Sequence, residues 1–209
     1  QSVLFPDNCH GKDSGGDPEA IPELTYEQFL DFHRSYYHPS NSYIYLYGNM
    51  DMAKKLTWLD EEYLCHYDER QVDSHIPEQK PFEKPQEREI FYSITGEEPE
   101  ENKTYLSLST VVGTDLDPML YVAFQILEYT LLGAPGAPLK QALLDAGIGK
   151  DVLGGYESGI LQPYFTVIAK DAGREQRGEF LAVVKGTLRR LADQGINKKS
   201  LMAGMNYYE

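Results

Sequence analysis

The sequence predicts an α+β fold, in which an antiparallel sheet carries helices on one face. Residues 89–209 alternate short β-branched and aromatic segments with amphipathic segments, in the order β-β-α-α-β-β-α-α. Residues 21–67 show a shorter helix, strand, helix pattern, and the 41% hydrophobic content is normal for a globular protein. We therefore expect two partial α+β units, residues 1–67 and residues 89–209, joined by an acidic, proline-containing linker at residues 68–88.

The first unit begins with a polar, glycine-rich stretch over residues 1–20. Thr25 and Gln28 form a capping box, which predicts a helix from residue 26 that ends before Pro39. Residues 42–47 are β-branched and aromatic, so they predict a strand. Asp51 then caps a second helix. Such a unit cannot bury both of its faces, and we expect residues 1–67 to be marginal alone or to borrow contacts.

The negative charge is concentrated around the linker. The formal net charge is −14, and residues 60–101 carry 14 acidic and 4 basic side chains, which is a net charge of −10. Residues 102–209 carry 11 of each sign. This distribution argues against binding to nucleic acid or to anionic membranes, since both need a basic surface. Pro77, Pro81 and Pro85 predict a stiff, extended path through the linker.

The second unit is predicted to start with a pair of antiparallel strands, residues 89–94 and 104–112, joined by the acidic loop 96–102. Pro118 marks the first turn of an apolar helix that runs to residue 132. A short helix at residues 139–146 and two strands, at 152–157 and 163–169, follow. Residues 175–194 form an amphipathic helix, and Asn197 caps the last one.

The two cysteines, Cys9 and Cys65, lie far apart in the sequence. One disulfide is conceivable, but a reducing compartment such as the cytoplasm fits this cysteine usage better. Residues 119–132 are the longest apolar stretch, and they are too short and too interrupted for a membrane span. The chain starts at Gln1 and stops within a predicted helix, so we expect a fragment of a longer protein.

A search for catalytic and metal-binding motifs finds no complete one. His33 and His38 are five residues apart and do not share a helix face, which argues against a zinc site. His66 begins a near miss to H-x-x-E-H, but Arg70 stands at the second ligand position, and a guanidinium cannot bind a cation. The simpler interpretation is a packed or solvent-exposed histidine in each case. There is no P-loop and no G-x-S-x-G.

Three other features have both a functional and a structural interpretation. The acidic run 97–101 could attract a cation, but a solvated loop fits it better. Gly154 and Gly155 are too loosely placed to hold phosphate, so we expect a bulge or a close strand approach. Tyr43, Tyr45 and Tyr47 alternate on one strand and could line a peptide cavity. A sheet face packed under helices is the favoured interpretation.

Six segments together carry a family resemblance: residues 21–28, 32–33, 37–41, 47–50, 136–143 and 147–149. They strongly resemble presequence-protease-type metallopeptidases of the insulinase/pitrilysin group. The resemblance implies a long enzyme of two halves that close around a peptide chamber, with zinc on an inverted H-x-x-E-H helix in the first domain. It also implies that these 209 residues hold the end of the first domain, the connector and most of a second, non-catalytic domain.

The resemblance also implies where a degenerate zinc helix lies in the second domain. Gln125 and Tyr129 stand at the two histidine positions, and only the glutamate, Glu128, is retained. An amide and a phenol do not make a zinc site. An ordinary buried helix that carries Gln and Glu at this spacing is the alternative, because short motifs match by chance. We expect no catalytic, metal or cofactor residue in this chain, and zinc only in the parent protein.

The resemblance leads to a first functional hypothesis. The chain is then a non-catalytic fragment of a zinc-dependent peptidase that degrades short or unfolded peptides, and it contributes scaffold and chamber wall. It would be inactive alone, and its partners would be the remainder of the same polypeptide and, in the parent, peptide substrates. The second hypothesis is part of a catalytically inactive structural or binding subunit of the same superfamily. The third is an acidic module that binds a basic protein through residues 60–101.

Overall fold

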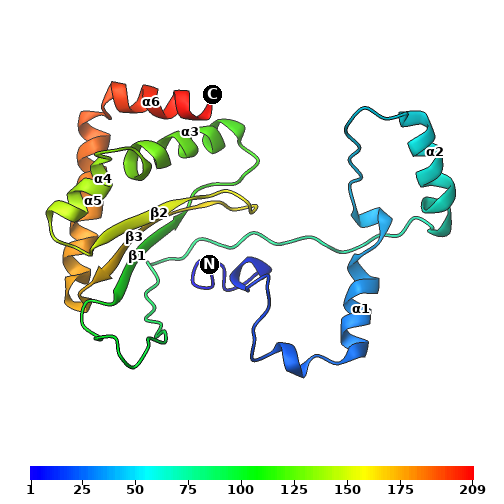
Figure 1. The fold of residues 1–209 in the computed structure, drawn as a ribbon, viewed down its shortest axis with the longest axis horizontal. Helices are drawn as coiled ribbons and strands as arrows, with labels where there is room; N and C mark the ends of the chain where they lie inside the picture. The colour runs from blue at the N-terminus through cyan, green and yellow to red at the C-terminus, as the bar shows by residue number, and fades with distance from the viewer. The chain divides into compact units, whose positions relative to one another are not determined.

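The computed structural model describes residues 1–209, which form two compact units (Figure 1). Unit 1 consists of residues 1–11 and 78–209, and unit 2 consists of residues 12–77. The first eleven residues therefore pack with the C-terminal part of the chain. The boundaries predicted at residues 67 and 89 are those of domains in a longer protein, and they stay a prediction.

Unit 1 contains an antiparallel sheet of three strands in the order β1-β3-β2, with helices on one side of it (Figure 1). The strands are β1 (Thr104–Val111), β2 (Asp151–Glu157) and β3 (Tyr164–Ala172). The helices are α3 (Pro118–Glu128), a π-helical turn (Tyr129–Gly133), α4 (Pro138–Asp145), α5 (Arg177–Gln194) and α6 (Lys198–Tyr208). This is the α+β layer that the sequence predicts.

The hydrophobic core lies between this sheet and the helices. Every second residue of a strand points to the same face of a sheet, and one such face of β3 is buried at Phe165, Val167 and Ala169. Leu139 of α4 and Phe180 of α5 cover it and are almost fully buried. Burying a side chain of this size stabilises the folded state by about 1.5–3 kcal/mol.

The helix starts in unit 1 follow the signals that the sequence carries. The Asp117 carboxylate accepts hydrogen bonds from the backbone N–H groups of Met119 and Leu120, so it satisfies two donors that the helix leaves free. Asn197 does the same for Lys199 and Ser200 at the start of α6.

Unit 2 contains two helices, α1 (Tyr26–Tyr36) and α2 (Met52–Glu62). The predicted capping box forms: the Thr25 hydroxyl accepts from the Gln28 N–H, and the Gln28 side chain accepts from the Thr25 N–H. The Arg70 guanidinium donates to the last carbonyl groups of α1. No residue between 12 and 77 is buried, so unit 2 has secondary structure but no hydrophobic core.

Two predicted strands are wrong in this structure. Residues 42–47 and residues 89–94 are extended, but neither segment pairs with another strand. The hydrogen-bond ladder of a strand needs a neighbour, and side-chain pattern alone does not supply one. Ile90, Phe91 and Tyr92 remain exposed for the same reason. The antiparallel pairing of residues 89–94 with residues 104–112 is therefore not present.

The structure also settles the state of the two cysteines and the character of the helices. Cys9 and Cys65 are both free and exposed, so no disulfide is formed. The reducing compartment stays a prediction. None of the helices combines the length and the apolar character that crossing a membrane requires.

Candidate functional site

The end of α3 and the start of the π-helical turn after it hold Gln125, Glu128 and Tyr129, which the family resemblance predicts as a degenerate zinc motif. Gln125 donates from its side-chain nitrogen to the Tyr121 hydroxyl at 3.0 Å, one helical turn earlier. Tyr129 stacks on Tyr207 of α6, with ring centroids 4.6 Å apart and an angle of 15° between the rings. Both side chains that replace histidine are therefore engaged with neighbouring tyrosines.

Glu128 lies against the edge strand β2. A Cβ atom placed on Gly155 would be 3.1 Å from the Glu128 Oε1, so the missing side chain of Gly155 leaves room for this carboxylate. Burial, followed by the charge of Glu128, raises the pKa of Tyr208 on α6. At neutral pH Tyr208 is therefore a neutral phenol in the neighbourhood of a carboxylate.

Helix α6 packs closely against the end of α3, beside these residues. The Thr130 hydroxyl donates to the Ile126 carbonyl at 2.7 Å, and Gly204 of α6 lies directly against this pair. A Cβ on Gly204 would be only 2.9 Å from the Thr130 Oγ1. The two helices can therefore approach each other here because residue 204 has no side chain.

These residues do not fit a zinc ion. Structural and catalytic zinc sites use thiolate, imidazole and carboxylate ligands, at least three of them from the protein. Glu128 is the one such ligand among the three motif positions. No three His, Cys, Asp or Glu side chains of the chain lie together in a way that could hold a metal ion. The positions that the family resemblance predicts as a degenerate zinc motif thus hold side chains that contact neighbouring tyrosines.

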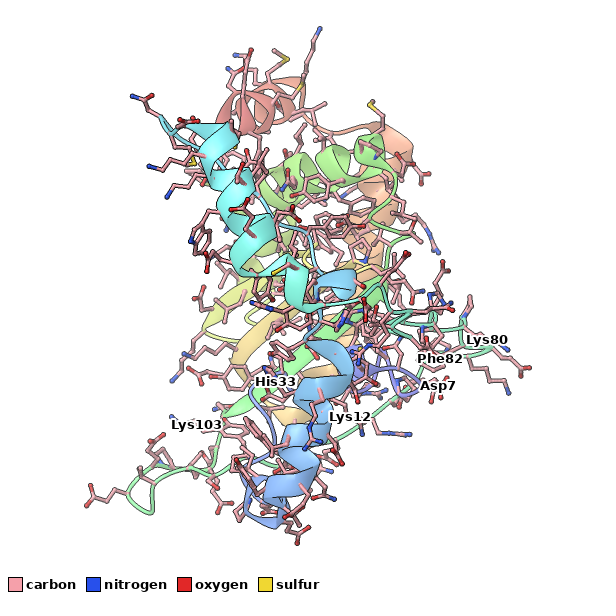
Figure 2. The ribbon with its side chains drawn as sticks, turned by 90° about the vertical axis from the view of Figure 1, so that its right-hand side faces the viewer. Asp7, Lys12, His33, Lys80, Phe82 and Lys103 are labelled. Atoms are coloured by element: carbon pink, nitrogen blue, oxygen red, sulfur yellow. The ribbon has the colours of Figure 1, made fainter.

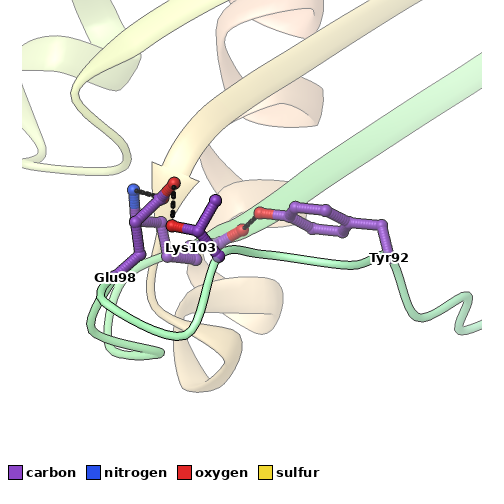
Figure 3. A network of polar contacts seen from close by, with 4 residues as sticks. Tyr92, Glu98 and Lys103 are labelled. Atoms are coloured by element: carbon purple, nitrogen blue, oxygen red, sulfur yellow. Dashed lines mark hydrogen bonds and ion pairs between the residues drawn. The ribbon is translucent and has the colours of Figure 1, made fainter.

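The acidic loop before β1 is held by its own polar contacts (Figure 3). Lys103 forms an ion pair of 2.8 Å with Glu98, and Thr95 donates to the same carboxylate at 3.1 Å. The Lys103 hydrogen bond, and then that of Thr95, lowers the pKa of Glu98. The Tyr92 hydroxyl donates to the Lys103 carbonyl. Glu98 of the acidic run is therefore already paired with Lys103 of the same chain. This pairing agrees with the interpretation of the run as a solvated loop.

The remaining candidates do not converge on a site. His33 stacks on Tyr37, and the His38 Nδ1 accepts from the Ser40 N–H. Arg70, at the failed ligand position of the near-miss motif, binds the end of α1. Four of the five histidines lie in unit 2 and the fifth is His10. None of them accompanies the end of α3.

The structure tests the interpretations of Gly154 and of the three alternating tyrosines at residues 43–47. Gly154 has a φ of 147°, and a Cβ there would be 2.2 Å from the Thr166 carbonyl oxygen, so the predicted close strand approach is confirmed. Tyr43, Tyr45 and Tyr47 are at least 83% exposed. The favoured interpretation, a sheet face packed under helices, is therefore wrong for the chain as it stands, because no helix covers them.

One polar cluster was missed by sequence reasoning. Gln79 and Gln162 are only 6% and 7% exposed and are hydrogen-bonded to each other, and Gln79 is also hydrogen-bonded to Asp7. Glutamine is normally a surface residue, and neither residue belongs to a periodic pattern. The only sequence signal was Phe5, a lone aromatic residue in a polar stretch, which is fully buried beside Tyr164.

A second buried group lies under α3. The hydroxyl of Tyr156 and one carboxylate oxygen of Asp115 are buried and have no hydrogen-bond partner in the protein. Burial, followed by the charge of Asp115, raises the pKa of Tyr156. Buried polar atoms of this kind commonly bind a water molecule.

A comparison with protein families matches residues 23–207 to the peptidase M16 inactive domain. Among curated proteins, the chain is 46% identical over 207 residues to protein HypA of Clostridium perfringens. This alignment covers 99% of the chain. It is 34% identical over 213 residues to presequence protease 1, chloroplastic/mitochondrial, of Arabidopsis thaliana. It is 29% identical over 212 residues to the mitochondrial presequence protease of Mus musculus.

The chain spans about a fifth of the length of these relatives: 21% of HypA and 20% of each of the two presequence proteases. The alignments with the two presequence proteases each cover 100% of this chain. The match therefore concerns one portion of much longer proteins.

Solved structures share the fold. A peptidase M16 inactive domain from Pseudomonas fluorescens superposes with a TM-score of 0.63 at 20% identity, over 95% of this chain and 46% of that one. A putative M16-like peptidase from Alicyclobacillus acidocaldarius gives a TM-score of 0.61 at 18% identity, over 99% of this chain and 48% of that one. The α+β fold class predicted from the sequence is thereby confirmed.

Proposed function

Because this chain belongs to the family of peptidase M16 inactive domains, we propose that it is the non-catalytic part of a zinc-dependent peptidase that degrades short or unfolded peptides. In this proposal residues 1–67 end the first α+β domain, residues 68–88 connect, and residues 89–209 begin the second domain. The chain supplies scaffold and chamber wall, and the zinc site lies elsewhere in the same polypeptide.

The observation that carries the proposal is the packing of the side chains at the end of α3, where the family resemblance predicts a degenerate zinc motif. Gln125 and Tyr129 are bound to Tyr121 and Tyr207, so the two positions contribute to packing. Side chains that pack at these positions and provide no ligand set for a metal support a scaffold role. No step of a hydrolytic reaction is assigned to these residues.

The sheet face opposite the core, away from the end where Phe5 packs beside Tyr164, supports the chamber-wall part of the proposal. The face opposite the core carries Ser109 beside Thr166, whose hydroxyls are hydrogen-bonded to each other at 2.8 Å, and a second cross-strand row of Ser107, Ile168 and Leu153. Hydroxyl groups next to moderate apolar area can contact peptides of many sequences, since they bind backbone groups and apolar side chains alike.

The relation of unit 2 to the rest of a longer protein follows from its exposure. Unit 2 has no buried residue, and Tyr43, Tyr45 and Tyr47 stand out from an unpaired extended segment. A helix or strand of a folded domain buries one face against another element. We propose that parts of the same polypeptide outside these 209 residues cover unit 2 and pair with residues 42–47.

The proposal is tested with the longest polypeptide that the gene encodes, purified without added metal. We expect one tightly bound zinc per chain and cleavage of an unfolded peptide. Glu128→Gln should leave both unchanged, since Glu128 is not a ligand in the proposal. Loss of zinc or of activity in Glu128→Gln, with the fold intact by circular dichroism, would contradict the scaffold role.

The alternative is a catalytically inactive structural or binding subunit of the same superfamily. It predicts no stoichiometric zinc and no peptide cleavage in the same polypeptide, while binding of unfolded peptides could remain. The metal analysis therefore separates the two functions before any variant is made. The acidic-module hypothesis receives less support, because Glu87, Glu89 and Glu98 are paired with Arg177, Arg174 and Lys103 of the chain itself.

A further inference from the structure

Residues 79–89 form a strap that spans the length of strand β3. Gln79 is bound to Gln162, just before β3 begins, and Glu89 is bound to Arg174, just after β3 ends. All of these residues belong to unit 1. The two ends of the strap are held by different chemistry, and this difference determines which end can release.

The first end is a buried clamp of amide groups. The Gln79 N–H donates to the Gln162 Oε1 at 2.6 Å, and the Gln162 side-chain nitrogen donates to the Gln79 carbonyl at 3.1 Å. The Gln79 side chain donates to the Asp7 carboxylate at 2.6 Å and accepts from the Asp7 N–H at 2.9 Å (Figure 2 shows Asp7 close to Lys80 and Phe82). Buried hydrogen bonds are costly to break and are hardly screened by salt.

The second end is held by two exposed ion pairs. Arg174 pairs with Glu89 at 2.8 Å, and Arg177 pairs with Glu87. The four side chains are between 52% and 75% exposed. Exposed pairs contribute little to stability, and salt screens them because the Debye length falls from about 30 Å at 0.01 M to about 3 Å at 1 M.

The extended length of the strap is only moderately greater than the length of strand β3. Ten residue steps separate Gln79 from Glu89 and reach about 33 Å when extended, at about 3.3 Å per residue. The eight steps of β3 cover about 26 Å. Pro81 and Pro85 favour an extended backbone. The strap is therefore largely extended while both ends are bound, with about 7 Å of its extended length to spare.

The core of unit 1 does not depend on the strap. No residue between 80 and 103 is buried, and the core residues come from the strands and helices that follow. The releasable part can thus leave the body while the sheet and helices stay folded.

We propose that residues 79–89 are an electrostatically latched strap: the amide clamp at Gln79 is permanent, and the Glu87 and Glu89 end opens when ionic strength rises. Opening frees residues 80–91, which lead into the loop that the contacts of Tyr92 and Lys103 hold before β1. This device is independent of the peptidase assignment, since it rests on contacts within unit 1 alone.

Limited trypsin digestion reads the latch directly. Lys80 and Lys84 precede prolines, which block trypsin, so Arg88–Glu89 is the cleavable bond within the strap. We expect cleavage of this bond to be slow in about 0.05 M salt and about three- to tenfold faster in about 0.5 M salt, the range that two exposed ion pairs allow. Mass spectrometry identifies the bond and gives its rate.

Two double variants isolate the cause. Arg174→Gln with Arg177→Gln removes the latch, and the Arg88–Glu89 bond should then be cut fast at both salt concentrations. Arg189→Gln with Arg190→Gln removes the same charge and the same number of tryptic sites from exposed positions of α5, and it should behave like the unchanged protein. Equal rates in the two double variants would overturn the proposal.

A spin label tests the asymmetry of the two ends. In a Cys9→Ser, Cys65→Ser background, a nitroxide at Gln86→Cys should become mobile in high salt, while one at Lys80→Cys, next to the clamp, should not. Loosening of both labels together would overturn the permanent end. Mobility that is independent of salt at residue 86 would overturn the latch.

Discussion

Units 1 and 2 have sequence patterns of the same kind but differ completely in burial. Both contain capped amphipathic helices, and Asp117 in unit 1 and Thr25 in unit 2 act as N-caps in the same way. Unit 1 buries a continuous cluster of side chains between sheet and helices, whereas unit 2 buries none. Local signals thus form helices in both units, and only a paired sheet turns them into a stable domain.

The largest expected difference is between two phenylalanines. Phe180 in α5 is 1% exposed, and Phe180→Ala should destabilise unit 1 by about 3–5 kcal/mol, because the cavity stays unfilled. Phe32 in α1 is 61% exposed, and Phe32→Ala should change the stability by less than about 0.5 kcal/mol. Urea unfolding followed by circular dichroism measures both.

The same pair tests whether unit 2 is covered in a longer protein. In the longest polypeptide that the gene encodes, Phe32→Ala should cost about 2 kcal/mol or more if other parts of the chain bury it. An unchanged stability there would refute the proposed covering of unit 2, while the value for Phe180→Ala should stay the same.

A smaller effect is expected at the contact between α6 and α3. Gly204→Ala places a methyl group 2.9 Å from the Thr130 hydroxyl oxygen, and overpacking of this kind costs about 1–3 kcal/mol. Gly178→Ala, on α5, meets nothing within 4 Å and should stabilise the protein by about 0.5–1 kcal/mol. A destabilised Gly178→Ala would show that helix packing does not explain the pair.

The smallest effect concerns pH. The Lys140 hydrogen bond of 3.0 Å, followed by the Val152 N–H, lowers the pKa of Asp151 in the folded state. A lowered folded pKa stabilises the fold above the unfolded value and loses this contribution as the pH falls through the folded pKa.

Asp151→Asn should therefore cost about 0.2–1 kcal/mol at pH 7, a range discounted because both partners are partly exposed. The cost should shrink below about pH 4. Urea midpoints at several pH values check this. Asp193→Asn, at an exposed position of α5, is the matched control, and an identical pH profile in both variants would contradict the role of the Lys140 pair.

Helix ends were predictable from the sequence because caps act within a few residues. The signals at Thr25, Asp51 and Asn197 all lead to helices in the structure. The strands at 42–47 and 89–94 were not predictable, because a strand needs a neighbour that local patterns do not name. The packing of residues 1–11 with unit 1 depends on Phe5 and on the Gln79 clamp, which likewise join distant parts of the sequence.

In the candidate site, too, the positions of the residues were predictable from the sequence, but most of their contacts were not. The positions of Gln125, Glu128 and Tyr129 followed from the family resemblance and from helical spacing. Their partners did not: Tyr207 lies almost 80 residues further along the chain, and Gly155 is on another strand. The contact of Gln125 with Tyr121 lies within one helical turn, whereas the contacts of Glu128 and Tyr129 join distant parts of the chain.

The clamp between Asp7 and Gln79 has a consequence for chain continuity. The backbone leaves unit 1 after residue 11 and returns at residue 78, and the side chains of Asp7 and Gln79 join the two points directly. A single proteolytic cut anywhere in residues 12–77 would therefore produce two fragments that remain associated, with buried Phe5 as the anchor.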